Sequence, residues 1–181
     1  MPHLNKGDKM ADFTYVTPYS SANRLSETVK KCPGRTAIVF LRYYGCRMCQ
    51  LDMLDYAEQY EAIRAAGGQL LVVLQSDPAK LAAQIAQGEL PFEIVCDPDQ
   101  KLYREFDIRP ASSKETMKDE STAVKAARIA ELGLVHGDYE GEELQLPAAF
   151  VVAHDLNVTW AHYGQVISDT PTAEELAALV R

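Results

Sequence analysis

The sequence predicts an α/β protein with one layered sheet and helices on both faces of that sheet. Three short apolar runs, residues 36–41, 70–74 and 92–96, have the pattern of buried strands, and helical patterns separate them. A later pair of strands, residues 149–153 and 158–162, is joined by a short turn and is expected to form a hairpin. Buried strands that alternate with helices are typical of parallel pairing, so we expect a mixed central sheet flanked by helices.

The N-terminal part contributes short elements to this plan. Residues 1–12 are polar and mixed in charge, and we expect a flexible lead-in there. Residues 13–16 alternate like a short strand, which a turn at Pro18 ends. Residues 23–31 then show a helical pattern, which Pro33 terminates.

The helix after the first buried strand is expected to span residues 47–66 and to end at Gly67. Its apolar stripe predicts the face that packs on the sheet, while its acidic residues are expected to face mostly outward. The apolar stripe consists of Met53, Ala57, Tyr60 and Ile63, and the acidic set of Asp52, Asp55, Glu58 and Glu61.

Four further helices are expected after the second buried strand. Residues 78–87 follow the second buried strand, and residues 101–106 form one or two turns after the third. A polar, exposed excursion over residues 110–122 leads into an inserted helix, residues 122–132, which precedes the late hairpin. A Thr–Glu capping box opens the final helix, residues 172–180.

Length and composition set the class of protein. A chain of 181 residues with 47% apolar and 24% charged residues suits a single globular domain over residues 1–181. The net charge of −8 argues against nucleic acid and anionic membranes as partners, and no apolar run is long enough to span a membrane. Residues 1–12 contain no apolar core of a signal peptide, and four cysteines make no disulfide framework, so we expect a reducing cytoplasm.

The chemistry of the chain is expected at Cys46 and Cys49, which lie where the first buried strand gives way to a helix. At a helix start, free N–H groups and the helix dipole favour a thiolate, so we expect Cys46 to attack and Cys49 to resolve. Residues one turn apart have side-chain carbons about 5–6 Å apart. A disulfide needs about 3.5–4.5 Å, which a small adjustment of the helix end provides.

Two alternatives to a redox function exist for the paired cysteines. Half a zinc site would need a second closely spaced pair, which Cys32 and Cys96 do not supply, and two inert structural thiols are the remaining alternative. We expect Cys32 to be an incidental exposed thiol, with a resolving cysteine as the alternative, and Cys96 to be a core residue. No cofactor and no metal are expected, since the histidines form no ligand pattern.

Three neighbours of the cysteines are candidate supporting residues. Arg47 lies between the two thiols and could stabilise a thiolate, although a solvated surface charge is the alternative. Tyr43 and Tyr44 follow the strand, and one of the two is expected to face the site because neighbouring strand residues point to opposite faces.

A strand, paired cysteines at a helix start and Pro147 before a late hairpin resemble the thioredoxin-like fold. More closely, the chain resembles redoxins of the AhpC/TSA superfamily, in particular a peroxiredoxin-like branch that carries a CxxC motif. The resemblance spans roughly residues 36–180. It is carried by residues 40–53, 144–150, 161–164 and 167–169.

The chain also departs from peroxiredoxins, which have Pro-x-x-x-Thr-x-x-Cys around the attacking cysteine. Tyr43 stands in the place of the threonine and Val39 in that of the proline. Pro147 replaces an arginine that helps to hold peroxide, as in thioredoxin-type proteins, where a cis proline packs against the disulfide. The resemblance therefore implies a cis Pro147, with a trans proline as the alternative. It also implies faster reaction with disulfides than with peroxide, unless Arg42 or Arg47 supplies the missing charge.

These observations favour a thiol-disulfide oxidoreductase that uses the Cys46/Cys49 dithiol in antioxidant or redox-homeostasis work. A peroxidase that reduces hydroperoxides is one alternative, and a non-catalytic redox-sensing or binding module is another. The expected substrates are protein or small-molecule disulfides or hydroperoxides, and the expected reductant is of the thioredoxin or glutathione type. A homodimer is compatible with the sequence.

Overall fold

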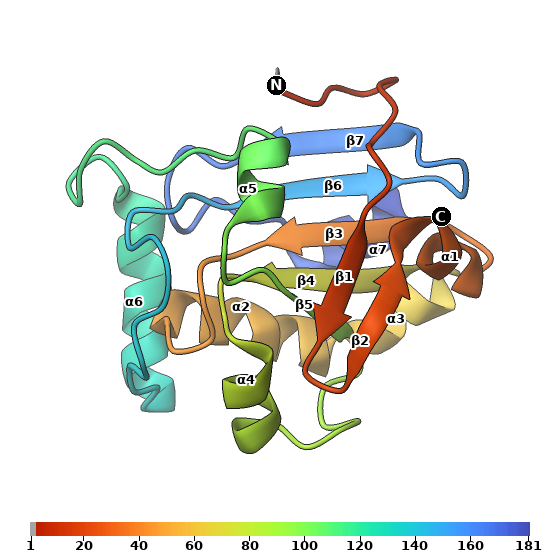
Figure 1. The fold of residues 1–181 in the computed structure, drawn as a ribbon. Helices are drawn as coiled ribbons and strands as arrows, with labels where there is room; N and C mark the ends of the chain where they lie inside the picture. The colour runs from red at the N-terminus through yellow and green to blue at the C-terminus, as the bar shows by residue number, and fades with distance from the viewer. Residues whose placement is uncertain (1–2) are drawn as a thin grey trace.

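One mixed sheet of seven strands organises the protein, in the order β2-β1-β5-β4-β3-β6-β7 (Figure 1). The structure is a computed structural model that describes residues 3–181. The strands are β1 (Thr14–Thr17), β2 (Ser20–Arg24), β3 (Thr36–Phe40), β4 (Gln69–Leu74), β5 (Glu93–Cys96), β6 (Ala148–Val152) and β7 (Val158–Tyr163). The helices are α1 (Leu25–Thr28), α2 (Arg47–Glu58), α3 (Tyr60–Ala65), α4 (Pro78–Gln84), α5 (Lys101–Glu105), α6 (Glu120–Leu132) and α7 (Ala173–Leu179), with a 3-10 turn at Val29–Lys31.

The pairing at the centre of the sheet confirms the predicted mixed topology. Strands β3, β4 and β5 run parallel, whereas β6 pairs antiparallel with β3 and β7 antiparallel with β6. Val39 on β3 lies between Val72 on β4 and Ala149 on β6. Strand β3 therefore has neighbours on both sides and is fully buried, which explains its uninterrupted apolar run.

Two apolar layers cover the two faces of this sheet. Val39 and the other side chains on its face of β3 pack with α2, α3 and α7. Ile38 and Phe40, on the opposite face, pack with the N-terminal segment, α1 and α5. Figure 1 shows α5 in front of the strands and α7 behind them. Because side chains alternate along β3, this one strand contributes to both apolar layers.

Two helices have other bounds in the structure than the sequence predicts. Residues 23 and 24, predicted to be helical, belong to β2, whose Arg24 pairs with Thr14 of β1, so the helix begins only at Leu25. Backbone pairing with β1 outweighs the local helical pattern there. The long helix predicted over residues 47–66 is divided at Gln59, whose φ of −106° and ψ of 9° separate α2 from α3.

The remaining helix predictions agree closely with the structure. Helix α6 is the expected inserted helix, and it ends at Gly133, which adopts a left-handed φ of 66°. Helix α7 begins with the predicted capping box, since Thr172 and Glu175 exchange side-chain to backbone hydrogen bonds. In the excursion before α6 most residues are exposed, but Met117 is buried.

The N-terminal segment lies beside the turn that leads into β7 and the start of that strand. The composition of residues 1–12 predicts a flexible lead-in, of which residues 1 and 2 lie outside the described part. Gly7 donates a backbone hydrogen bond to Val158, and Met10 donates one to Leu156. Met10 is also buried in the core. Residues 7–10 are thus packed onto the domain through main-chain and apolar contacts.

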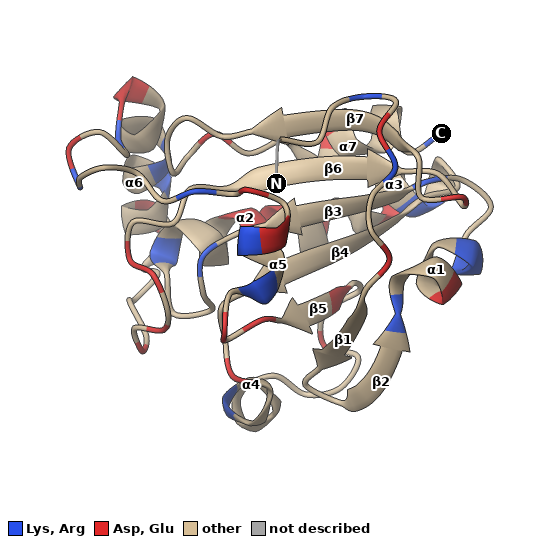
Figure 2. Cartoon of the chain, turned by 45° about the horizontal axis from the view of Figure 1, so that its top comes forward, with Lys and Arg blue, Asp and Glu red and all other residues tan. Residues whose placement is uncertain are grey.

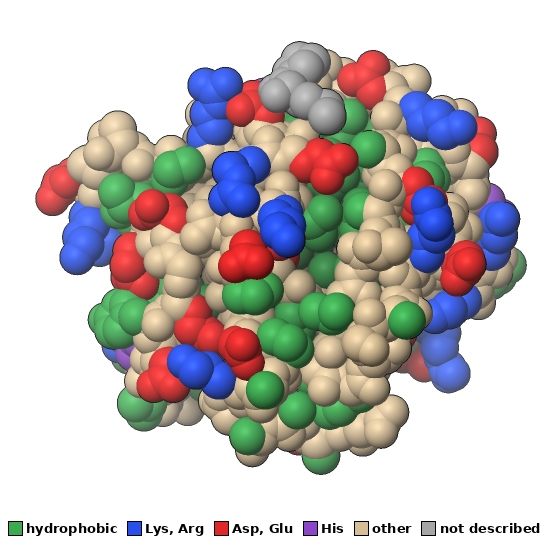
Figure 3. Space-filling model, in the orientation of Figure 1, with side chains coloured by type: hydrophobic (Ala, Val, Ile, Leu, Met, Phe, Trp, Pro, Cys, Tyr) green, Lys and Arg blue, Asp and Glu red, His purple; other side chains and the backbone are tan. Residues whose placement is uncertain are grey.

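Charges are distributed over the surface without a single-sign face in the views drawn. Acidic and basic side chains alternate over the face in Figure 3, and both signs occur in the loops beside α6 (Figure 2). Within residues 3–181, no helix has the length and apolar content that crossing a membrane requires.

Helix α6 is attached to α2 by two ion pairs of similar length and different burial. Lys125 Nζ lies 2.7 Å from Asp52 Oδ1, and Arg128 Nη2 lies 2.7 Å from Asp55 Oδ1. The Asp52 side chain is only 6% exposed, so the prediction that it faces outward is wrong. Thr170 also donates a hydrogen bond to Asp52, which completes the partners of this buried carboxylate.

The buried pair is expected to stabilise the fold far more than the exposed one. Lys125→Met leaves the Asp52 carboxylate uncompensated in the core and should lower the free energy of unfolding by about 3 kcal/mol. The matched control Arg128→Met removes an exposed pair and should cost less than about 1 kcal/mol. Urea unfolding followed by circular dichroism measures both. Equal losses in the two variants would contradict the role assigned to burial.

Candidate active site

Cys46 occupies the N-cap position of α2, directly after the loop that leaves β3. Its backbone is extended, with φ of −68° and ψ of 121°, and its Sγ accepts a hydrogen bond from the backbone N–H of Cys49 at 3.3 Å. The backbone N–H of Cys46 donates to Tyr43, which closes the turn before the helix. The sulfur therefore lies at the positive end of the helix and replaces the usual oxygen of an N-cap.

Arg42 contacts both thiols from the loop before the helix. Its Nη2 lies 3.2 Å from Cys46 Sγ, and its backbone N–H donates to Cys49 Sγ at 3.3 Å. Its Nη1 donates to the carbonyl oxygen of Glu143 and lies 4.0 Å from the carboxylate of that residue. Glu143 thus orients the guanidinium, and the guanidinium supplies a positive charge at the sulfur of Cys46.

The environment shifts the pKa values of the two thiols in opposite directions. Burial opposes ionisation of Cys46, but a hydrogen bond from Cys49 and the charge of Arg42 outweigh it and lower the pKa of Cys46 to about 6. Burial and the neighbouring Cys46 thiolate raise the pKa of Cys49 well above its ordinary value. One thiolate and one thiol are the expected state at neutral pH.

The thiols are covered by protein but lie next to an open groove. Cys46 is 0% exposed and Cys49 is 3% exposed. A groove of about 510 Å³ lies between the start of α2, α6 and the loops before and after α6, and Arg42 forms part of its wall. Because Arg42 also contacts Cys46, the sulfur is one side chain away from the groove.

The tyrosines that follow β3 occupy two different environments. Tyr43 is fully buried, and its hydroxyl is hydrogen bonded to His136 Nε2 at 3.1 Å, while its ring lies 5.3 Å from the guanidinium carbon of Arg42. Tyr44 is half-buried, and its backbone N–H donates to Ser76. Of the two tyrosines, Tyr43 faces the thiol side of the loop.

Arg47 lies on the outside of the site, not between the sulfurs. Its side chain is exposed and lines the groove, with no hydrogen bond or ion pair to either thiol within residues 3–181. The exposed side chain fits the alternative of a solvated surface charge, because a helix points successive side chains in different directions. The contact with the thiol comes from Arg42.

Pro147 lies near Cys49 through a small cavity of about 10 Å³ that both residues line with Asp52. The implied cis bond is wrong, since no cis peptide bond occurs among residues 3–181. The alternative of a trans proline at the entry of β6 is therefore the one observed. The carbonyl of Pro147 accepts the backbone N–H of Gly164, which links the start of β6 to the end of β7.

The loop after α6 is held tightly against the turn that carries Cys46. Gly137 donates a backbone hydrogen bond to the carbonyl of Gly45, and Gln50 bonds both that carbonyl and the carbonyl of Val135. A side chain at Gly45 would collide with the backbone of Asp138. This close approach explains the glycine before Cys46, and it holds the segment that leads to Glu143 beside the site.

The other two cysteines are separate from this site. Cys96 on β5 is in the core as predicted, and burial raises its pKa to about 12. Cys32 is buried, not exposed as predicted, and burial raises its pKa as well. Within residues 3–181, no group of three or more His, Cys, Asp or Glu side chains has the arrangement of a metal site.

Sequence reasoning gave too little weight to Arg42 and misplaced Asp52. A signal for Arg42 was available, because it is the one charge between a fully apolar strand and the cysteines. A signal for Asp52 was its spacing, since Cys49, Asp52 and Tyr56 recur at helical intervals on one buried face. Lys125 had no such signal, because its contact with Asp52 spans 73 positions of sequence.

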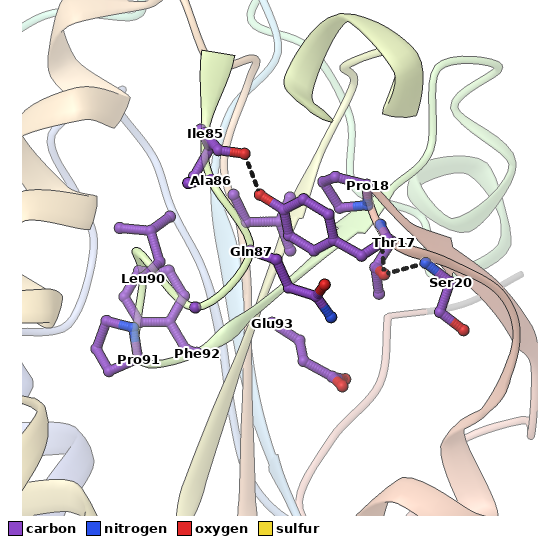
Figure 4. A pocket seen from close by; sticks show the side chains of 13 residues that line it. Thr17, Pro18, Ser20, Ile85, Ala86, Gln87, Leu90, Pro91, Phe92 and Glu93 are labelled. Atoms are coloured by element: carbon purple, nitrogen blue, oxygen red, sulfur yellow. Dashed lines mark hydrogen bonds between the residues drawn. The ribbon is translucent and has the colours of Figure 1, made fainter. Parts of the chain in front are cut away.

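A second cavity, of about 360 Å³, lies away from the thiols near β1 and β5 (Figure 4). The turn after β1 and residues 85–94 form its walls, and the hydroxyl of Tyr19 donates to the carbonyl of Ile85 across it. None of the four cysteines lines this cavity, so it is not part of the thiol site.

A mixed sheet with two close thiols at the end of its central strand defines a redox protein of the thioredoxin fold. Residues 6–161 match the AhpC/TSA family, and the chain belongs to this family. The resemblance inferred from the residues around Cys46 is thereby confirmed at the level of family and fold. None of the curated protein sequences compared with the chain matches it.

Solved structures of the same fold include peroxiredoxins and other redoxins. Peroxidoxin BcpB from Mycobacterium tuberculosis has a TM-score of 0.69 at 13% identity, covering 99% of this chain and 97% of that chain. The thiol peroxidase from Chromobacterium violaceum has a TM-score of 0.61 at 14% identity, covering 93% and 81%. StoA from Bacillus subtilis has a TM-score of 0.54 at 16% identity, covering 94% and 97%. At these identities the similarity establishes the fold.

The shifted pKa of Cys46 predicts a specific pH dependence. Thiolate absorbance and alkylation by iodoacetamide should both fall as pH drops through about 6. An unfolded cysteine has a pKa of about 8.5. The folded protein therefore binds fewer protons between these values, and the stability that Cys46 contributes above pH of about 8.5 is lost as pH falls towards 6.

Substitution at Arg42 should move this transition. Arg42→Met removes the positive charge at the sulfur and should raise the pKa of Cys46, so that thiolate absorbance appears only at higher pH. Arg47→Met is the matched control and should leave the titration unchanged, because Arg47 does not contact the thiols. A shift with Arg47→Met and none with Arg42→Met would reverse the assignment.

Proposed function

We propose that the protein is a thiol-disulfide oxidoreductase in which Cys46 attacks the substrate and Cys49 resolves the intermediate. The observation that carries this proposal is the position of Cys46 Sγ. It lies 3.2 Å from the Arg42 guanidinium and 3.3 Å from the backbone nitrogen of Cys49. A nucleophile held as thiolate beside a protonated partner is what dithiol exchange requires.

The reaction conserves atoms and electrons in two exchange steps. The Cys46 thiolate attacks one sulfur of a substrate disulfide, the S–S bond breaks, and a first substrate thiolate leaves and takes a proton from solvent. Cys49 then loses its proton and attacks Cys46 Sγ, which releases the second substrate thiol and forms the Cys46–Cys49 disulfide. The substrate is reduced by two electrons, and a thioredoxin- or glutathione-type reductant returns the protein to the dithiol.

The second step needs a proton acceptor, because burial raises the pKa of Cys49 well above its ordinary value. Asp52 is a buried carboxylate that lines the same small cavity as Cys49. The cavity, about 10 Å³, has roughly the volume of one water position. Asp52 can accept the proton through such a water, because burial raises the pKa of this carboxyl group and Lys125 offsets only part of that shift.

Hydroperoxide reduction is the second candidate function, and Arg42 favours it. Pro147 removes the arginine expected in a peroxiredoxin, but the guanidinium of Arg42 supplies a positive hydrogen-bond donor at the same sulfur. In this reaction Cys46 attacks a peroxide oxygen, the O–O bond breaks, and the leaving oxygen takes a proton. Cys49 then condenses with the resulting sulfenic acid, which releases water and forms the same disulfide.

A trapping experiment tests the order of attack. In Cys49→Ser the mixed disulfide between Cys46 and glutathione disulfide should accumulate, because no thiol remains to resolve it. Cys46→Ser should form no adduct at Cys49 under the same conditions, since Cys49 keeps its proton. Mass spectrometry of peptides reads out the site. In the native chain mild oxidation should remove about two hydrogens from the single segment that carries both cysteines.

An adduct on Cys49 that forms faster than one on Cys46 would reverse the two roles. An oxidised product that links Cys32 or Cys96 to either thiol would contradict the proposed pair.

The choice between disulfide and peroxide is settled by stopped-flow oxidation of the reduced protein. We expect slow reaction with hydrogen peroxide and faster reaction with disulfides, because Pro147 donates no hydrogen bond to a peroxide. Loss of one preorganised donor typically costs about 10²–10³ in rate. Steady-state turnover with NADPH, thioredoxin reductase and thioredoxin, with peroxide or insulin, checks the result.

A peroxide rate constant equal to that of a dedicated peroxiredoxin, reduced about 100-fold by Arg42→Met, would establish the peroxidase instead. No turnover with either substrate would favour the non-catalytic redox-sensing module.

A further inference from the structure

We propose that the groove beside Arg42 binds disulfides that carry a carboxylate group on an apolar body. The inference rests on the proposed disulfide exchange and names its substrate class. The groove has a volume of about 510 Å³, which is within the range of small-ligand sites. It lies against the start of α2, and the inserted helix α6 with its two flanking loops forms the opposite wall.

The apolar part of the proposed ligand matches the deep wall of the groove. Met48, Met117, Ile129 and Ile167 all line it and belong to the core layer that packs on the sheet. Each is less than a tenth exposed, so the groove reaches down to the core. Two of these side chains are methionines, whose flexible thioethers adapt to an inserted apolar group.

The anionic part matches the cations at the groove. Arg47, Lys114 and Lys118 line it and are exposed, and none forms an ion pair within residues 3–181. Glu115 does not line the groove, and its pKa is lowered by a backbone hydrogen bond and by Ser113, with smaller contributions from Lys118 and Lys114.

Two carboxylates also line the groove, against four cations. Asp119 caps α6 by accepting the backbone N–H groups of Ser121 and Thr122. The Glu143 carboxylate lies 4.0 Å from Arg42 Nη1, and its Oε1 is buried without a hydrogen-bond partner among the described residues. The charge of the groove lining is therefore positive on balance, although the whole chain has a net charge of −8. A carboxylate ligand is the complement of such a site.

Arg42 connects the groove to the reacting sulfur. Arg42 lines the groove, and its Nη2 lies 3.2 Å from Cys46 Sγ. A disulfide at the inner end of the groove would lie against Arg42, one side chain away from Cys46 Sγ, with its carboxylate towards Lys114 and Lys118.

The test compares the rates at which three disulfides modify Cys46 in the full chain. Dithiobis(nitrobenzoate) is aromatic and anionic, dithiodipyridine is aromatic and uncharged, and dithiodiacetate is anionic with almost no apolar body. Each rate is divided by the rate of the same reagent with free glutathione, which removes intrinsic reactivity. We expect the largest normalised rate for dithiobis(nitrobenzoate).

Charge reversal in the groove should remove this preference. Lys114→Glu with Lys118→Glu should slow dithiobis(nitrobenzoate) roughly 10-fold at low salt and leave dithiodipyridine within about twofold. The matched control reverses Lys6 and Lys30, two exposed lysines outside the groove, and gives the same net charge. Added salt should reduce the difference between the rates at which dithiobis(nitrobenzoate) modifies the groove variant and the control variant.

The outcomes separate the groove from the proposed function. Failure of all three reagents to modify Cys46 would overturn the disulfide exchange itself. Modification of Cys46 with equal normalised rates, or an equal effect of the groove and control reversals, would overturn the groove inference alone. The groove inference alone would also be overturned if the groove variant, with an unchanged circular dichroism spectrum, kept the preference for dithiobis(nitrobenzoate).

Discussion

The contact between Arg42 and Cys46 is the interaction on which the rest of the site depends. Transfer of a thiolate into a fully buried position is costly unless charge and hydrogen bonds compensate it. The start of α2 contributes part of that compensation, and the guanidinium contributes the rest at 3.2 Å. Arg42 in turn needs the carbonyl of Glu143, which lies just before β6. Two segments about a hundred positions apart must therefore meet before the sulfur can ionise.

The position of helix α6 is tied to the same need to bring Glu143 to Arg42. Helix α6 is anchored to the cysteine helix by Lys125 on the buried Asp52, and the loop after it is held against Gly45. The insertion thus forms one wall of the groove and leads the chain to Glu143.

The secondary structure was largely predictable because its signals are local. The apolar run of β3, the stop at Gly133 and the capping box of α7 all act within a few residues. The errors arose where distant contacts outweighed such signals. Pairing with β1 converted the start of the first predicted helix into β2, and the fold broke the long helix at Gln59. A helical pattern is a weaker constraint than a set of backbone hydrogen bonds to a neighbouring strand.

The sequence by itself determined the pair of cysteines, their place at a strand-to-helix junction and the family of the chain. These properties depend on spacing and on local geometry, which a sequence contains directly. The tertiary structure decided which arginine meets the sulfur, that Asp52 is buried and paired, and that Pro147 is trans. It also decided where the groove lies. Each of these depends on segments that are far apart in the chain, and their distances are set only when the sheet brings them together.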